Sequence, residues 1–181
     1  ANFSLSNSRY AFDIGYDAES NTDFNLGYSV EETELRAFNR FRINDRHRLT
    51  FGLAGKLYNV RPGTLEPDGS ESDVVGQDLP KEQGVEGGVF IADDWDVTDR
   101  LSVSAGVRLS VFAATGPSEQ NVYAPGQPRN PGTVIDTLTY GSGETIKTYG
   151  GPEVRFSTRY LITPEFSIKA GFSNMYQYIH T

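Results

Sequence analysis

Apolar and polar residues alternate one by one along most of the chain. In 101–113 the odd positions, from Leu101 to Ala113, are all apolar, whereas Phe112 is the one apolar residue at the even positions. A helix would instead repeat its apolar residues every three to four positions. The alternation therefore predicts β-strands that have one apolar and one polar face.

The same period recurs along the whole sequence, for example in Tyr10, Phe12, Ile14 and Tyr16, which alternate with residues such as Asp13. It predicts seven strands, at 3–17, 25–43, 47–61, 84–97, 100–113, 146–162 and 166–179. Most of them are longer than the roughly 5–6 residues of an ordinary globular strand, and long enough for the ~9–11 residues that cross a bilayer. The expected fold is all-β, an antiparallel up-and-down meander that forms part of a transmembrane β-barrel.

The links between these strands alternate in length. The short links are 44–46, 98–99 and 163–165, the long ones are 62–83 and 114–145, and 18–24 is intermediate. Because successive strands run in opposite directions, all short turns fall at one end and all long loops at the other. Outer-membrane barrels have this arrangement, with short periplasmic turns and long extracellular loops.

Composition excludes several classes of protein. The 181 residues carry a formal net charge of −8, which argues against a nucleic-acid partner because nucleic-acid binders need a basic face. No Cys is present, which excludes a Cys nucleophile and Cys-ligated metals. No stretch approaches the ~18 apolar residues of a transmembrane helix, and 1–4 contain no signal peptide.

Candidate chemistry is sparse. His47 and His180 are the two histidines, and neither stands in a His-Glu-x-x-His motif. Asp94 and Asp96 share one face beside a short turn, where acids are simply solvated. We therefore expect no catalytic residue, no cofactor and no metal site, and interpret the protein as not being an enzyme.

The 62–83 loop is strongly acidic. It has six carboxylates against Lys81, so its net charge is −5. Asp68, Glu71 and Asp73 are close enough in sequence to suggest a calcium site. A solvated acidic loop is the favoured interpretation.

The polar and apolar faces of the predicted strands indicate two further sets of candidate residues. Six arginines fall on the polar faces, which line the lumen of a barrel: Arg36, Arg40, Arg42, Arg108, Arg155 and Arg159. Four aromatic residues lie near short turns and are expected to form an interfacial girdle: Phe41, Trp95, Tyr160 and Phe166.

Residues 89–108 form a characteristic hairpin. An aromatic-containing strand leads to Asp94-Trp95, and after a short turn Arg100-Leu101 begins a strand that alternates into Gly106-x-Arg108. This hairpin resembles one that is common in TonB-dependent outer-membrane receptors. Segments 45–52 and 149–180 are similar to receptors of this family from Bacteroidota-type bacteria.

The resemblance implies a 22-stranded barrel with an N-terminal plug domain, in which extracellular loops and plug bind a nutrient and TonB moves the plug. Residues 1–181 would be an internal barrel segment that lacks the plug and the barrel ends. The implied partners are the lipid bilayer of the Gram-negative outer membrane, the plug domain, the remaining strands and, indirectly, TonB. The lumen arginines would then contact plug carboxylates or an anionic solute. The ligand, whether siderophore, glycan, peptide or cobalamin, is not specified.

Two alternatives stay open. The first is a stand-alone small outer-membrane barrel with a structural or adhesive role, in which 133–140 supplies an eighth strand. The second is a soluble all-β binding module with acidic loops. A soluble sheet should carry charge on both faces, whereas the clearest strands here carry it on one.

Overall fold

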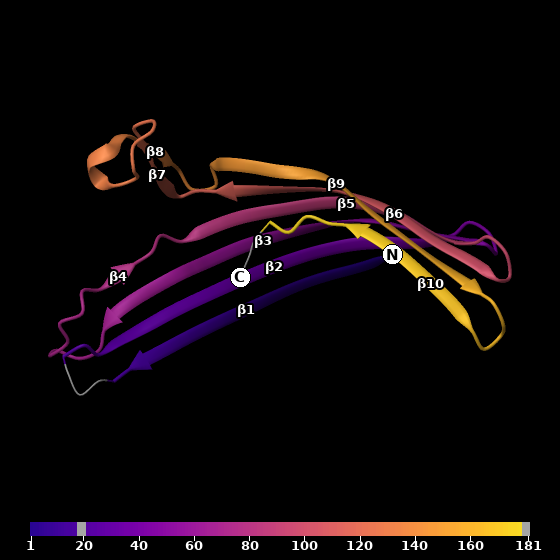
Figure 1. Cartoon of the computed structure of the whole chain (residues 1–181), viewed down its shortest axis with the longest axis horizontal. Helices are drawn as coiled ribbons and strands as arrows, with labels where there is room; N and C mark the ends of the chain where they lie inside the picture. Colours follow the sequence, from indigo (N-terminus) through magenta and orange to yellow (C-terminus); the bar gives the residue numbers. More distant parts are fainter. Residues whose placement is uncertain (18–20, 179–181) are drawn as a thin grey trace.

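The computed structural model describes residues 1–17 and 21–178 and consists of one large, curled antiparallel sheet (Figure 1). Its strands pair in the order β1-β2-β3-β5-β6-β9-β10. Their bounds are Asn2–Tyr16 for β1, Phe24–Arg42 for β2, His47–Pro67 for β3, Glu82–Asp96 for β5, Leu101–Thr115 for β6, Thr145–Leu161 for β9 and Ser167–Asn174 for β10. The meander of seven long strands is confirmed, and the sheet has the shape of half a barrel.

Two predicted strand ends differ from the structure by more than two residues. β3 continues from the predicted end at 61 to Pro67, with a register shift opposite Gly27/Ser29 that accommodates Pro62 and Gly63. β10 ends at Asn174 rather than at 179, and residue 179 lies outside the described residues. Tyr178 leaves the sheet because its ring stacks on Phe112 of β6, at 5.5 Å between centroids.

The long loops carry structure of their own. Within 62–83, β4 (Gln77–Asp78) pairs with β3. Within 114–145, β7 (Ser118–Tyr123) and β8 (Val134–Tyr140) form a separate two-stranded sheet, joined through the short helix η1 (Pro131–Thr133). This β7–β8 hairpin projects from the large sheet (Figure 1), so 133–140 adds no strand to the wall. Among the described residues, no helix has the length and apolar character needed to cross a membrane.

The two faces of the sheet follow from the pairing, because directly opposed residues point to the same side. Arg36 opposes Ala54, Lys56 opposes Glu86, and Arg108 opposes Glu153. Side chains of this parity line a hollow of about 530 Å³, so they lie on the concave face. The other parity forms the convex face.

The convex face carries an apolar band. Along β3 it runs from Leu49 to Leu57, and along β5 from Val85 to Trp95. These lengths match the ~9–11 residues of a membrane-crossing strand. The band is exposed: Leu53 is 48% and Val107 51% exposed, and the buried hydrophobic side chain in the described part of the chain is Phe112. The fold thus has no closed core within the described residues.

Near the loop end, the convex face changes from apolar to polar and the concave face from polar to apolar, at the same level of the strands. On the convex face, the row Thr33-Leu57-Val85 is followed by the polar row Glu31-Asn59-Gln83. On the concave face, the row Glu32-Tyr58 is followed by Val30-Val60 and then by more apolar residues. Apolar side chains therefore cover the convex face between this level and the short turns. Between this level and the long loops they cover the concave face instead.

Candidate functional site

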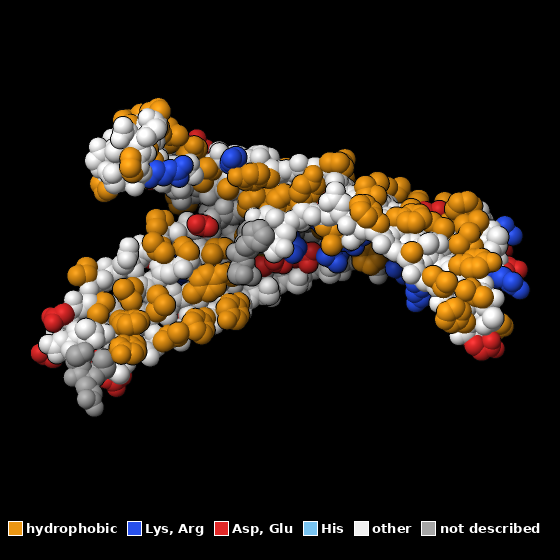
Figure 2. All heavy atoms as spheres, in the orientation of Figure 1, with side chains coloured by type: hydrophobic (Ala, Val, Ile, Leu, Met, Phe, Trp, Pro, Cys, Tyr) orange, Lys and Arg blue, Asp and Glu red, His pale blue; other side chains and the backbone are white. Residues whose placement is uncertain are grey.

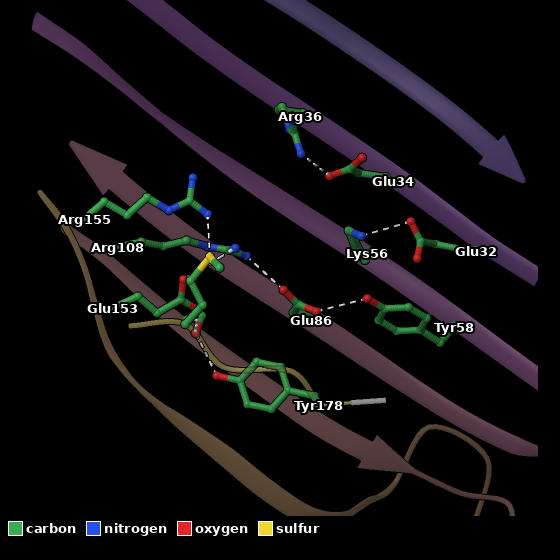
Figure 3. A network of polar contacts seen from close by, with 12 residues as sticks. Glu32, Glu34, Arg36, Lys56, Tyr58, Glu86, Arg108, Glu153, Arg155 and Tyr178 are labelled. Carbon is green, nitrogen blue, oxygen red and sulfur yellow. Dashed lines mark hydrogen bonds and ion pairs between the residues drawn. The ribbon is translucent and has the colours of Figure 1, made fainter. Parts of the chain in front are cut away.

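A belt of charged residues crosses the middle of the concave face (Figure 3). It contains four acids and four bases: Glu32, Glu34, Glu86 and Glu153 with Arg36, Lys56, Arg108 and Arg155. Lys56 Nζ lies 3.0 Å from Glu32 Oε1, and Arg36 Nη2 lies 2.9 Å from Glu34 Oε1. The charges of the belt cancel.

Glu86 is the centre of this belt. One of its oxygens accepts from Arg108 Nη2 at 2.8 Å, and the other accepts from the Tyr58 hydroxyl at 3.0 Å. Arg108 also approaches Glu153, with 3.9 Å between Nη1 and Oε2. Because the Glu86 side chain is 14% exposed and that of Glu153 3%, these acids depend on protein partners rather than water.

A short chain of hydroxyl groups continues from Glu153. Ser110 Oγ donates to Glu153 Oε1 at 2.7 Å, and the Tyr178 hydroxyl lies 2.7 Å from the same Oγ. Since a Ser hydroxyl has one hydrogen, which Glu153 takes, Tyr178 is the donor in the second bond. Ser110 and Glu153 are both buried, beneath the segment that carries Tyr178.

The six predicted lumen arginines all lie on the concave face, by their ladder partners. Three of them are neutralised within the described residues: Arg36 by Glu34, Arg108 by Glu86, and Arg42 by Asp45 at 2.8 Å. Arg40, Arg155 and Arg159 have no carboxylate within ion-pair distance in that part of the chain, although Arg155 Nη2 contacts Met175 Sδ at 2.9 Å. Of these three unpaired arginines, Arg155 lies in the belt, and Arg40 and Arg159 lie between the belt and the short turns.

The four predicted girdle residues all have the convex parity or adjoin it at the short-turn end. Trp95 opposes His47 and Val103, Tyr160 opposes Leu101, and Phe41 opposes Leu49. Phe166 precedes β10 and pairs through its backbone with Ile162. All four are between 41% and 58% exposed, and they stand where the apolar band meets the turns.

Comparison with known proteins agrees with this geometry. The family model for the β-barrel of TonB-dependent receptor-like proteins matches residues 1–177. The chain belongs to this family.

Among solved structures, this TonB-dependent receptor segment is similar to the copper transporter OprC, with a TM-score of 0.61 and 11% sequence identity. The match covers 94% of the chain but 26% of the transporter, so the chain spans about a quarter of that structure. At this identity the likeness concerns the fold alone. No curated protein matches the sequence.

Candidate metal ligands are not brought together. No group of three or more His, Cys, Asp or Glu side chains in the described residues could hold a metal ion, and that includes Asp68, Glu71 and Asp73. His47 instead pairs with Asp93 on the convex face, with 2.6 Å between Nδ1 and Oδ2, and its ring stacks on Trp95. His180 lies outside the described residues.

Sequence reasoning singled out three of the eight belt residues, Arg36, Arg108 and Arg155, and missed the other five and the adjoining Tyr58. Glu32, Lys56, Tyr58 and Glu86 were not singled out, because each is one polar residue in an alternating strand. The signal that would have found them is the register. Once short turns fix the pairing, Lys56 falls opposite Glu86, and Tyr58 opposite Glu32. The register thus brings these groups within reach of one another, but the ion pairs in the structure are diagonal, Lys56 with Glu32 and Arg108 with Glu86.

Proposed function

We propose that this chain is part of the wall of an outer-membrane import receptor that binds a nutrient and is energised by TonB. The observation that carries the proposal is the pair of opposite faces. The convex face has an apolar band long enough to cross a bilayer, and the concave face has a charged belt. Lipid requires an apolar outer surface, whereas a lumen tolerates charge. Family membership supports transport rather than enzymatic activity.

The edges of the sheet support partners within the same barrel. β1 and β10 each pair on one side in the described residues, so the other side of each strand has free backbone groups. In hydrocarbon such an edge costs several kcal/mol per unsatisfied group, so only a closed barrel is viable. We therefore assign further barrel strands as neighbours of β1 and β10.

The unpaired arginines are the proposed contacts of the plug domain. Arg40, Arg155 and Arg159 point into the concave side without a carboxylate of this part of the chain. Carboxylates of a plug are suited to them, because a bidentate Arg–carboxylate pair combines charge with fixed geometry. The paired arginines Arg36, Arg42 and Arg108 are assigned to the wall itself.

The test compares cells that have or lack the full-length protein, each with and without functional TonB. The cells are given siderophores, glycans, peptides and cobalamin, and depletion from the medium is measured by mass spectrometry. We expect at least one compound to be depleted only when both proteins are present. Depletion that persists without TonB, or no difference in any class, would contradict energised import.

A further inference from the structure

The loop-end third of the concave face is lined with aromatic side chains. We call it the aromatic zone, and it consists of Tyr10, Phe12, Tyr16, Phe24, Tyr28, Tyr58 and Phe112. Figure 2 shows hydrophobic side chains gathered over the loop ends of β1, β2 and β3, at the lower left. Tyr10 is 62% exposed and Phe12 45%.

This zone is not a lipid surface. At the same level the convex face is polar, with Arg9, Glu31, Asn59 and Arg61. A bilayer would cover the convex side of a barrel wall, so the aromatic zone faces the interior above the membrane. Large apolar patches in contact with water mark sites where something else binds.

A hollow of about 380 Å³ lies in this zone. Its apolar lining includes Tyr28, Tyr58, Val60 and Phe112. Ser118 and Gln120 add uncharged polar side chains to this lining, which Gln83 and Thr115 also touch although they have the convex parity. Lys81 and Glu82 contribute one charge of each sign, so the hollow has no net charge. Its size is in the range of small-molecule sites, which combine an apolar lining with a few polar groups.

The structure also indicates which shape fits this floor. The Tyr178 ring lies parallel to the Phe112 ring, with an interplanar angle of 11°. Its hydroxyl donates to Ser110, as described above. The Tyr58 ring meets Phe112 edge-on at 6.2 Å. The protein's own Tyr178 ring thus occupies the face of Phe112, which is 7% exposed. Ring faces remain open to a ligand at Tyr28, which lines the hollow, and at Tyr10, which is 62% exposed.

We propose that the aromatic zone binds an uncharged ligand that carries a ring and hydroxyl groups. The proposal rests on the import function proposed above, and it names the substrate class of that receptor. A ring stacks on the aromatic floor, and amide and hydroxyl side chains donate to and accept from ligand hydroxyls. Phenols and neutral sugars both have this chemistry, and a bare metal ion does not.

The test measures binding by the full-length receptor in lipid nanodiscs, without an energy source. Equilibrium dialysis is carried out with naphthol as a phenol and methyl glucoside as a neutral sugar, and with a copper(II) salt as the metal arm. We expect saturable binding of naphthol or methyl glucoside. The compound that binds shows whether the ring of the ligand is that of a phenol or that of a sugar.

The decisive variant is Gly84→Ala. A Cβ there would lie 2.6 Å from two ring carbons of Phe112, so the floor of the hollow must move. Gly87→Ala, on the convex side of the same strand, meets Val111 at an ordinary 3.8 Å and is the matched control. Gln120→Ala tests the polar lining without touching the wall. We expect Gly84→Ala to weaken binding by about tenfold and Gly87→Ala to leave it unchanged.

Failure of this inference differs from failure of the import function. Binding of neither ring probe, binding of copper alone, or equal affinities in all variants would overturn the aromatic site. If Gly84→Ala weakens ring binding in nanodiscs while cells show no TonB-dependent uptake, the aromatic site is supported and the import function is refuted.

Discussion

Arg108 reaches across Gly88 to bind Glu86, with 2.8 Å between Nη2 and Oε1. In the ladder Arg108 lies opposite Phe90 rather than opposite the acid. The side chain lies over Gly88, where a Cβ would come within 2.7 Å of Nε. The central ion pair of the belt therefore depends on a glycine in the neighbouring strand.

The first prediction concerns the strength of this pair. A double-mutant cycle with Arg108→Ala and Glu86→Ala should give a coupling free energy of about 1–2 kcal/mol, because Glu86 is mostly buried. The cycle for Arg36 and Glu34 should give about 0–1 kcal/mol, since the Arg36 side chain is 51% exposed. Both are measured by denaturant unfolding of the full-length protein in lipid. Equal coupling in the two cycles would contradict the proposed centre of the belt.

The second prediction separates the two neighbouring glycines. Gly88→Ala should displace Arg108 and remove its coupling to Glu86, whereas Gly87→Ala should preserve it. The Arg108 side chain can move, so we expect Gly88→Ala to fold and insert. The same double-mutant cycle in each glycine background is the measurement. Intact coupling in Gly88→Ala would show that the space above Gly88 is not required.

The alternation of residues was sufficient to predict the strands but not where each apolar face points. Leu49–Leu57 and Tyr10–Tyr16 both alternate, yet the apolar side chains of the first are convex and those of the second are concave. One period-two pattern fits both cases. The difference appears only when the register of β1, β2 and β3 is known, because it places the change of face at the same level in each strand.

The end of β10 was not predictable for a related reason. Tyr176 and Tyr178 continue the alternation of Ile168 and Phe172, which favoured a longer strand. The contacts that divert Tyr178 are with Phe112 and Ser110, more than 60 positions away in sequence. Such partners cannot be read from a local period.

The third prediction tests which face meets lipid. Spin labels at Val103, Phe156 and Ile168 should be accessible to oxygen dissolved in the bilayer. Labels at Ser104 and Arg155 should be shielded from it, since these positions have the concave parity. The measurement is power-saturation electron paramagnetic resonance on the full-length protein in liposomes. An inverted or mixed pattern would contradict the half-barrel orientation.

The fourth prediction gives the energetic consequence of that orientation. Val107 lies in the middle of the convex band, opposite Ile91 and Val154. Val107→Arg should disfavour insertion by roughly 2–4 kcal/mol, which is the cost of a cation at the bilayer midplane. Ser104→Arg places the same charge on the concave face and should cost much less. A refolding titration into lipid vesicles measures both, and equal costs would refute the assignment of faces.

The last prediction concerns which end of the wall faces outside the cell. The β7–β8 hairpin and the loop that contains β4 leave the end opposite the short turns, and both are rich in polar residues (Figure 1). Loops of this kind on a rigid scaffold tolerate change and often carry binding. Trypsin added to whole cells should therefore cut at Arg129 or Lys81 before it cuts at Arg46 or Arg100 in the short turns.

Deletion provides the complementary measurement. Removal of 118–140 takes out a sheet that shares no ladder with the wall, so barrel assembly should persist while ligand uptake changes. Replacement of Arg129 by Gln is the control for the proteolysis, because it should abolish that cut and leave uptake unchanged. Cleavage first at Arg46 or Arg100 would show that the short turns, and not the long loops, face outside the cell. The aromatic zone would then lie on the periplasmic side, which a ligand from outside reaches last.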